Sequence, residues 1–391
     1  MGWLSPLLLY YLPLTVAIGT CLYQLAVVIA AFRFRGEKEP RADFTPPVSV
    51  LKPLRGIEPH FYETLSAYFR QEYPGYEIVF GVSDPKDPAI WTIAQLQREF
   101  PNIPVKVVVV QDAGGANPTN PKMAKLQQMV AEASHEILVI SDADISVGPT
   151  YLRDVVRSLA DARVGMVTCL YRGIQSGSLR SVIEALGMSS EFAGQVLLGR
   201  ALGGPGGPGE MRFGLGATMA TRKKQITEIG GLAPWANYLA DDYILGNRIA
   251  AAGYKIHLSK TVVETLLPRR SWRELFHQQL RWARTIRACS PRGYPGLLFA
   301  YAAPLALIPA LYHPTTLSLA VLDCALILRW IAAWASGVLV CRDRLIRNYF
   351  WLIPIRDLLA LMVWVASFAG REIVWRQNRF RLESDGRIRP V

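Results

Sequence analysis

Residues 5–32 form a run of 28 residues without a charged side chain. About 20 apolar residues are enough for a helix to cross the hydrocarbon core of a bilayer. A cleaved signal peptide would begin with basic residues and have a shorter apolar stretch, but no Lys or Arg precedes this run. The sequence therefore predicts a retained N-terminal membrane anchor over residues 1–33.

Basic residues follow the anchor at once: Arg33, Arg35, Lys38 and Arg41. Lysine and arginine are enriched in cytoplasmic flanks of membrane helices. This bias places the N-terminus outside and the chain after residue 33 in the cytosol. We expect an integral, multi-pass protein of a bacterial inner membrane or a eukaryotic internal membrane.

Three further apolar segments lie near the other end of the sequence, at residues 294–312, 317–340 and 349–369. The loop 313–316 has no Asp, Glu, Lys or Arg, which suits the outer side, and the loop 341–348 holds three arginines, which suits the cytosol. A fourth crossing would put the tail, residues 371–391, outside, yet this tail carries six arginines against three acids. Either the charge rule fails for the last segment, or one segment does not cross.

Charged residues inside these segments favour the second alternative. Asp323 and Arg329 lie in one segment, and Arg356 and Asp357 lie in the next. Each intramembrane charge costs roughly 2.5–3.5 kcal/mol on insertion scales, and an interfacial or re-entrant helix would avoid part of that cost. We therefore expect three or four spans in all, with residues 293–370 as the C-terminal membrane region.

The composition narrows the classes of partner. Apolar residues make up 51% of the chain, and its net charge is +12. The arginines cluster beside apolar runs, and no zinc-finger or RNA-binding signature is visible, so we expect lipid and pyrophosphate as partners rather than nucleic acid. The five cysteines form no Cys-x-x-Cys pair, which indicates neither a disulfide framework nor a zinc site.

Between residues 46 and 292 short β-rich runs alternate with helical patterns. Strands are predicted at residues 48–51, 77–82, 105–110 and 136–140, and helices at residues 59–71, 90–100 and 121–133. This alternation predicts an α/β domain with a mostly parallel sheet. In such sheets, ligands bind beyond the carboxyl ends of the strands. Aspartates follow three of the predicted strands there: Asp84, Asp112, and the pair Asp142 and Asp144.

Asp142-x-Asp144 follows the apolar run at 136–140 directly. Carboxylate oxygens are the ligands that Mg²⁺ and Mn²⁺ prefer, and such ions commonly bridge carboxylates to phosphates. Solvated turns also use aspartate often. The position at a strand end favours a divalent-cation site that neutralises a departing diphosphate.

Two single residues have alternative interpretations. Asp84 either contacts the base or ribose of a nucleotide or forms an Asx turn before Pro85. Lys122 follows Asn120-Pro121 at the start of a predicted helix. It either meets a phosphate at the helix N-terminus or is a solvated lysine.

Two further motifs lie downstream. Asp241 and Asp242 precede a helical stretch and either cap it or supply a general base. Gln278, Arg281 and Trp282 share one face of a helix. Arg281 suits a phosphate and Trp282 a sugar or lipid. Alternatively, this is a juxtamembrane amphipathic helix whose arginines, Arg284 and Arg287 included, meet lipid headgroups.

The segment 184–212 has an apolar part and a Gly/Pro-rich stretch at 203–209. The apolar part is either an ordinary buried helix or a surface against the membrane. The glycine stretch is predicted to be a mobile loop, and it is not a phosphate loop because no Gly-Lys-Ser/Thr follows.

Together, Asp84, Asp142-x-Asp144, Asp242 and Gln278-x-x-Arg281-Trp282 resemble the D, DxD, D, QxxRW series of inverting glycosyltransferases with the GT-A fold. Six segments of the sequence resemble ceramide glucosyltransferases: VSVLKPLRG, GVSDPKDPA, NPKMAKL, VTCLYRG, LADDYILG and HQQLRWART. Bacterial enzymes that glycosylate hopanoids are similar. The similarity covers roughly residues 46–290, together with the N-terminal anchor and the C-terminal membrane region.

This resemblance implies a cytosolic GT-A domain at 46–292 that transfers glucose from UDP-glucose to the hydroxyl of ceramide, with inversion, in glycosphingolipid biosynthesis. It implies that Asp84 and Asp142 hold the nucleoside and ribose, Asp144 the metal, and Arg281 the leaving diphosphate. Asp242 is the implied base and Asp241 its rival, while Gln278 and Trp282 lie in the acceptor or leaving-group region.

Other functions remain open at this stage. They are transfer of N-acetylglucosamine or another sugar to a hopanoid or other lipid, a polyprenyl-phosphate acceptor, a polymer synthase, and an inactive nucleotide-sugar-binding protein. Four or fewer spans count against the polymer synthase, which needs a channel. The intact acidic and Arg-Trp positions count against the inactive protein.

Overall fold

The computed structural model describes residues 4–40, 42–58, 60–110, 120–203, 209–375 and 378–391, with side chains from residue 10 on. Asp112 and most of the predicted loop at 203–209 lie outside the described residues. The chain divides into two compact units. The helical unit comprises Met1–Glu37, Gln175–Leu202 and Arg269–Arg379, and the α/β unit comprises Lys38–Ile174, Gly203–Pro268 and Phe380–Val391. Within the run 46–292, which was predicted as one catalytic domain, residues 175–202 and 269–292 group with the apolar helices.

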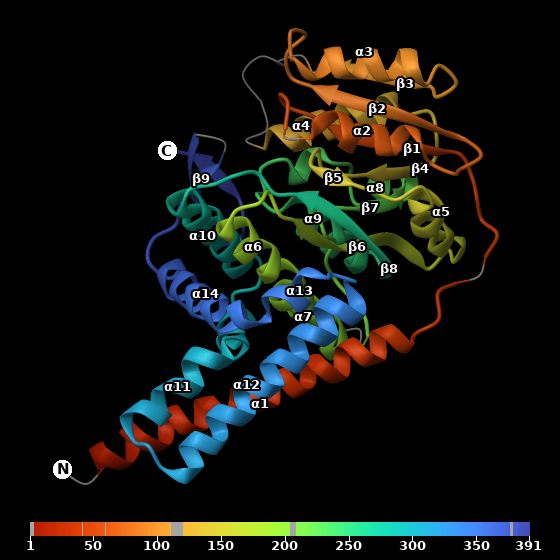
Figure 1. Ribbon diagram of the computed structural model, residues 1–391. Coiled ribbons are helices and arrows are strands. Elements are labelled where there is room, and N and C mark those ends of the chain that lie inside the picture. Colours follow the sequence, from red (N-terminus) through yellow and green to blue (C-terminus); the bar gives the residue numbers. More distant parts are fainter. Residues whose placement is uncertain (1–3, 41, 59, 111–119, 204–208, 376–377) are drawn as a thin grey trace. The chain divides into compact units, whose positions relative to one another are not determined.

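The α/β unit is built on an eight-stranded sheet with the order β3-β2-β1-β4-β7-β6-β8-β5 (Figure 1). Its strands are β1 Val48–Pro53, β2 Tyr76–Val82, β3 Val105–Val109, β4 Ile137–Ile140, β5 Ile145–Ser146, β6 Val164–Ile174, β7 Met219–Arg222 and β8 Lys255–Leu266. β3, β2, β1 and β4 pair in parallel, and so do β6 and β8, whereas β7 and β5 are antiparallel to their neighbours. The mostly parallel sheet is thus confirmed.

The helices of this unit are α2 Phe61–Phe69, α3 Ala89–Glu99, α4 Pro121–Glu132, α5 Tyr151–Val156, α8 Lys223–Glu228 and α9 Asp241–Ala251, with short 3₁₀ turns at Arg157–Ala160 and Ala233–Trp235. The four strands and three helices predicted between residues 48 and 140 are all present. β1, β2 and β4 are buried along their whole length, as continuous apolar runs in a parallel sheet must be.

The register of the central strands builds the edge at which the site forms. Leu51 of β1 lies opposite Ile140 of β4, and the backbone N–H of Ser141 donates to the carbonyl of Leu51 over 3.1 Å. Because both strands run in parallel, Lys52 and Asp142 leave the sheet at the same edge.

The helical unit contains α1 Leu4–Gly36, α6 Leu179–Leu186, α7 Ala193–Leu202, α10 Trp272–Cys289, α11 Ala302–Tyr312, α12 Thr316–Ala333, α13 Leu345–Tyr349 and α14 Ile353–Ser367. π-Helical turns follow α6 at Gly187–Phe192 and α12 at Trp334–Val340, and 3₁₀ turns lie at Tyr294–Ala300 and Phe350–Leu352. α1, α11 and α12 pack along one another (Figure 1).

Three described helical stretches are long and apolar enough to cross a membrane: Tyr10–Gly36, Thr316–Val340 and Leu345–Ser367. A fourth span is possible if Tyr294–Ala300 and Ala302–Tyr312, which meet at an angle of 68°, are counted as one. The predicted number of three or four spans agrees with this result.

Charged residues inside the apolar segments form ion pairs and hydrogen bonds within the helical unit. The Arg329 guanidinium donates to both carboxylate oxygens of Asp357 over 2.9–3.0 Å, and both side chains are fully buried. Arg356 lies 2.9 Å from a carboxylate oxygen of Glu191 and donates to the side-chain carbonyl of Gln279 over 3.0 Å. This pairing lowers the insertion cost that the sequence suggested.

The segment that begins at residue 184 is buried inside the helical unit. Residues 185–190 have little or no exposed surface, and α7 packs against α1. Gly187 is needed at this place, because a Cβ there would lie 2.4 Å from Nε of Arg356. The interpretation as a buried helix is therefore the one that the structure bears out.

The last residues of the chain are not a simple basic tail. β9 Glu372–Trp375 lies in the helical unit, while β10 Asn378–Leu382 pairs antiparallel with β11 Ile388–Pro390. In the α/β unit the Ile388 N–H donates to the carbonyl of Asn237 over 2.8 Å, and the Leu239 N–H donates to that of Gly386 over 3.2 Å. The chain end thus holds the loop that leads into α9.

Candidate active site

The Asp142-x-Asp144 motif forms the turn between β4 and the short strand β5. β5 pairs with β8, with Ile145 opposite Thr265, and the Thr265 hydroxyl donates to the Asp144 carboxylate over 2.7 Å. Burial raises the pKa of Asp144, and the negative charge of Asp142 adds to that rise. The prediction that both aspartates follow the strand is confirmed.

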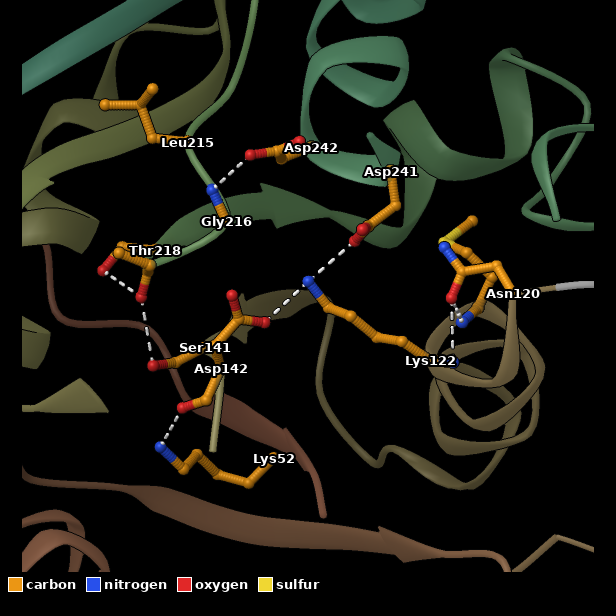
Figure 2. Close-up of polar contacts among 12 residues, drawn as sticks. Lys52, Asn120, Lys122, Ser141, Asp142, Leu215, Gly216, Thr218, Asp241 and Asp242 are labelled. Carbon is orange, nitrogen blue, oxygen red and sulfur yellow. Dashed lines mark hydrogen bonds and ion pairs between the residues drawn. The ribbon is translucent and has the colours of Figure 1, made fainter. Parts of the chain in front are cut away.

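Lys122 connects the two acidic motifs. Its Nζ lies 2.6 Å from Oδ1 of Asp142 and 2.7 Å from Oδ2 of Asp241 (Figure 2). Burial alone would lower the pKa of Lys122, but the charges of the carboxylates outweigh it and hold the pKa above its usual value. The side chain is only 13% exposed, so the alternative of a solvated lysine is wrong.

Asn120 positions Lys122 and was missed by the sequence reasoning. Its side-chain oxygen accepts the N–H groups of Lys122 and Met123, which caps α4 beside the predicted proline at the first helical turn. Its side-chain amide donates to the carbonyl of Tyr238 over 2.9 Å. The cap therefore fixes α4 to the loop that precedes Asp241. An Asn before Pro at a helix start was a usable signal.

Asp241 and Asp242 occupy the first turn of α9, whose N-cap is Ala240 without a side-chain cap. Neither aspartate is therefore the N-cap residue of α9. Asp242 accepts a hydrogen bond from the N–H of Gly216 over 2.8 Å (Figure 2). It also accepts one from the N–H of Tyr243 over 2.8 Å. Negative charge at a helix N-terminus is favoured by the helix dipole.

The two neighbouring carboxyl groups differ in their partners. Asp241 is paired with Lys122, whereas Asp242 accepts hydrogen bonds from backbone N–H groups. Burial raises the pKa of Asp242 to about 6, with a further rise from the charge of Asp241. Burial also raises the pKa of Asp241, against the lowering effect of Lys122. Asp242 can thus take up a proton close to neutral pH.

Gly216 allows the carboxylates to approach one another. A Cβ on Gly216 would lie 3.0 Å from Oδ2 of Asp142 and 3.3 Å from Oδ2 of Asp242. Any larger residue would push against both side chains. This glycine was also missed, because the contact joins residues far apart in the sequence.

Lys52, at the end of β1, is a third residue that sequence reasoning missed. It is fully buried, and its Nζ donates to the carbonyl of Asp142 over 2.6 Å (Figure 2). Burial lowers the pKa of Lys52 to about 7, although the charges of Asp144 and Asp142 oppose this change.

Asp84 lies beyond the carboxyl end of β2, in an exposed turn. Its carboxylate accepts the N–H of Lys86 over 2.8 Å, so the Asx turn proposed as an alternative is present. Asp87 is the buried carboxylate of this segment, and it accepts the N–H groups of Gly56 and Ala89 over 2.9–3.1 Å. A role for Asp84 in nucleoside binding stays a prediction.

Gln278, Arg281 and Trp282 lie on α10, in the helical unit, and are half-buried. A capping box of Ser271 and Glu274 begins this helix. The Arg284 guanidinium donates to the carbonyls of Ala369 and Glu372, and Arg287 donates to that of Gly370. These two arginines therefore hold the chain at the end of α14.

The donor set at the Asp142-x-Asp144 turn suits a hard divalent cation. Asp142 and Asp144 offer oxygen ligands, and the Asp142 side chain is 36% exposed. Among the described residues, no group of three or more His, Cys, Asp or Glu side chains gathers to hold a metal on its own. A cation held by one or two carboxylates and completed by phosphate oxygens of a substrate is the usual arrangement for Mg²⁺.

The mixed sheet with an acidic turn at its carboxyl edge has a GT-A-like fold. The mannosyltransferase PcManGT from Pyrobaculum calidifontis, solved in complex with GDP-Man and Mn²⁺, shares this fold with a TM-score of 0.52. The match covers 91% of this chain and 99% of that structure at 19% identity.

Residues 10–388 match the family described as glycosyl transferase family 21, and the chain belongs to this family. It is 24% identical to ceramide glucosyltransferase 1 of Caenorhabditis elegans, over 93% of this chain and 78% of the relative. It is 21% identical to ceramide glucosyltransferase 3 of the same organism, over 95% and 80% of the two chains.

Proposed function

We propose that this protein transfers glucose from UDP-glucose to the hydroxyl of a membrane lipid, ceramide, with inversion to a β-glucoside. Membership of glycosyl transferase family 21 and the similarity to two ceramide glucosyltransferases support the proposal. The observation that carries it is the different environment of the two adjacent carboxylates. Asp241 is paired with Lys122, and Asp242 has a pKa raised to about 6.

Asp242 acts as the general base in this proposal. The lipid hydroxyl gives its proton to the Asp242 carboxylate, while the hydroxyl oxygen forms a bond to the anomeric carbon of glucose. The bond from that carbon to the UDP oxygen breaks, and UDP leaves with the electron pair. Such proton transfer is worth on the order of 10²–10⁴ in rate. Asp241 is the weaker candidate, since its ion pair with Lys122 disfavours protonation.

The donor binds at the carboxyl edge of the sheet. Asp84 and Asp142 contact the nucleoside and ribose. From its motif we assign Arg281, on α10, to binding of the leaving diphosphate. Asp144, with Asp142, holds Mg²⁺ or Mn²⁺, which when bound supplies positive charge beside the diphosphate. Lys122 keeps Asp142 and Asp241 in place and has a proton to donate toward a phosphate oxygen.

In this proposal the lipid acceptor reaches the active site from the membrane. Gln278 and Trp282 share a face of α10 with Arg281, and we assign them to the acceptor or leaving-group region. The apolar helices hold the protein in the bilayer that contains the lipid acceptor.

We infer the membrane topology from the chain segments that make up the α/β unit. This unit contains residues before and after the C-terminal apolar helices. If it lies wholly in the cytosol, the chain crosses the bilayer an even number of times between residues 268 and 380. Two crossings there and one by α1 make three, which leaves one C-terminal segment interfacial and the arginine-rich chain end in the cytosol. An epitope after Val391 should be accessible from the cytosolic side only.

The test is a turnover assay with purified protein in detergent or nanodiscs. Radiolabelled UDP-glucose and UDP-N-acetylglucosamine are each offered with ceramide, a hopanoid polyol, diacylglycerol or a polyprenyl phosphate, in Mg²⁺ or Mn²⁺. Asp242→Asn and Asp241→Asn variants run beside the wild type as a matched pair.

Glucosylceramide from the wild type, with a loss on the order of 10²–10⁴-fold in Asp242→Asn and a smaller loss in Asp241→Asn, is the expected result. A larger loss in Asp241→Asn would move the base to that residue. Transfer of N-acetylglucosamine to a hopanoid would keep the mechanism and replace the substrates. Nucleotide binding without turnover on any acceptor would overturn the enzymatic proposal.

A further inference from the structure

Lys52 is a buried ammonium group directly beneath the Asp142-x-Asp144 turn. It is the second-to-last residue of β1, has no exposed surface, and belongs to the sequence VSVLKPLRG, for which the proposed function gives no role. Burying a charge is costly unless polar groups surround it. An apolar side chain of similar length would fill the same space without that cost. A lysine at this position is therefore expected to have a role besides packing.

The partners of the Lys52 ammonium group lie on the acidic turn. Nζ donates to the carbonyl of Asp142 over 2.6 Å and to that of Ile145 over 3.4 Å, so it contacts both ends of the turn. The Asp142 carbonyl also accepts the N–H of Ile145 over 3.3 Å, which closes the turn. A single side chain on β1 thus connects the first and last residues of the loop that carries the two carboxylates.

A second set of contacts fixes Lys52 and the start of the turn together. Nζ lies 4.0 Å from the centre of the Tyr68 ring, a favourable distance for a cation and an aromatic face. The Tyr68 hydroxyl is hydrogen-bonded to Ser141 over 2.6 Å, and Ser141 donates to the carbonyl of Ala217 over 3.1 Å. Residues of α2 and β1 therefore contact the backbone and the start of the turn, while Lys122 contacts the Asp142 carboxylate.

We propose that Lys52 is a positioning residue that sets the Asp142-x-Asp144 turn for binding a divalent cation together with a nucleoside diphosphate. It acts through the backbone carbonyls of the turn. This inference rests on the proposed function, because it assumes that the turn binds a cation–diphosphate complex. Outer contacts of this kind typically change metal affinity by 10–100-fold when they are removed.

The test measures binding without any acceptor lipid. Wild-type protein, Lys52→Met and Lys52→Gln are titrated with Mn²⁺ in the presence and absence of UDP, and bound Mn²⁺ is followed by electron paramagnetic resonance. Lys125→Met is the matched control. Lys125 is also a fully buried lysine, on α4, and its Nζ donates over 2.5 Å to the carbonyl of Leu54, two residues after Lys52.

We expect Lys52→Met to weaken Mn²⁺ binding in the presence of UDP by about 10–100-fold. Lys52→Gln, which keeps a donor but loses reach, should have a smaller effect in the same direction. Lys125→Met should stay within about twofold of the wild type. In turnover, the KM for the donor should rise in Lys52→Met while the KM for the acceptor is unchanged. A residue with a merely structural role would not produce this split.

Three results would overturn the inference. One is a folded Lys52→Met that binds Mn²⁺ and UDP within about twofold of the wild type. Another is an equal effect in Lys125→Met, which would show a general response to loss of a buried lysine. The third is that neither Lys52 variant folds, which would make Lys52 a core residue. Failure of the wild type itself to bind Mn²⁺ with UDP would overturn the proposed function as well, and it is recognised without any variant.

Discussion

The helical unit and the α/β unit both bury charged side chains, but they balance them differently. In the helical unit two buried arginines are each paired with one carboxylate, Arg329 with Asp357 and Arg356 with Glu191. In the α/β unit Lys122 alone contacts two carboxylates, and the neighbouring Asp242 is held by backbone N–H groups.

This difference separates charges that build the structure from charges that are available for chemistry. In a one-to-one pair the two charges balance each other. A group of carboxylates with too few cations favours uptake of a proton or a metal ion. The carboxylates of Asp142 and Asp241 share the single cation Lys122, with Asp242 beside them.

The most direct way to break this comparison is to remove one cation from the helical unit. Arg329→Ala leaves Asp357 buried without its bidentate partner. We expect a loss of about 3–5 kcal/mol in the free energy of unfolding, measured by thermal or denaturant unfolding in detergent. The double variant Arg329→Met/Asp357→Leu should recover most of this loss. A double variant as unstable as the single one would show that the pair does more than neutralise itself.

A smaller but more specific effect is expected at Gly216, in the α/β unit. Gly216→Ala would press a methyl group on Asp142 and Asp242. Misplacement of reacting groups by about 1 Å can cost about 10²-fold in rate, so we expect kcat to fall by about 10–100-fold. The control is Gly75→Ala, because a Cβ at Gly75 meets no atom within 4 Å. Unchanged turnover in Gly216→Ala would mean that the carboxylates have room to move.

The pH dependence of the reaction sharpens the assignment of the base. Asp242 must be ionised to accept a proton, and its pKa is raised to about 6. We therefore expect kcat/KM to be constant above that pH and to fall about tenfold per pH unit below it. Because the charge of Asp241 contributes to the rise, the profile of Asp241→Asn should move to lower pH. A wild-type profile that is flat down to pH 4 would contradict the assignment.

The smallest effect is expected at the cap of α4. Asn120→Ala removes the side-chain oxygen that caps the helix carrying Lys122. A lost cap costs about 1 kcal/mol, which should appear in the unfolding free energy together with a modest loss of turnover. Thr150→Ala is the control, since Thr150 precedes α5 without capping it. Equal effects of the two substitutions would argue against a special role for Asn120.

The sequence predicted local patterns well. β1, β2, β3 and β4 are short apolar runs, which is why these strands, the helices between them and the acidic turn after β4 could be predicted. The other parallel pair, β6 and β8, was not predicted. β7 Met219–Arg222 was not recognised, because its four residues include Thr221 and Arg222 and give no clear period. β10 and β11 were not predicted, because the arginine-rich sequence of residues 371–391 was interpreted as a basic tail.

Contacts between distant residues could not be predicted. The partner of Arg329 is 28 residues away, and the Asp142 carbonyl that Lys52 contacts is 90 residues away. Lys122 was recognised as a residue of the site, but its two carboxylate partners depend on how α4, β4 and α9 come together. Such pairs arise from the tertiary arrangement rather than from any spacing in the sequence.

A polar residue of α1 acquires its hydrogen-bond partner only late in synthesis of the chain. The buried side chain of Gln24, in the middle of α1, donates to the carbonyl of Ala300 over 3.0 Å across a separation of 276 residues. At about 5–20 residues per second, the ribosome reaches Ala300 roughly 15–55 s after Gln24. For that interval the amide needs a substitute partner, such as lipid headgroups, water or the insertion machinery. Assembly of the helical unit is therefore a late event in the biogenesis of this protein.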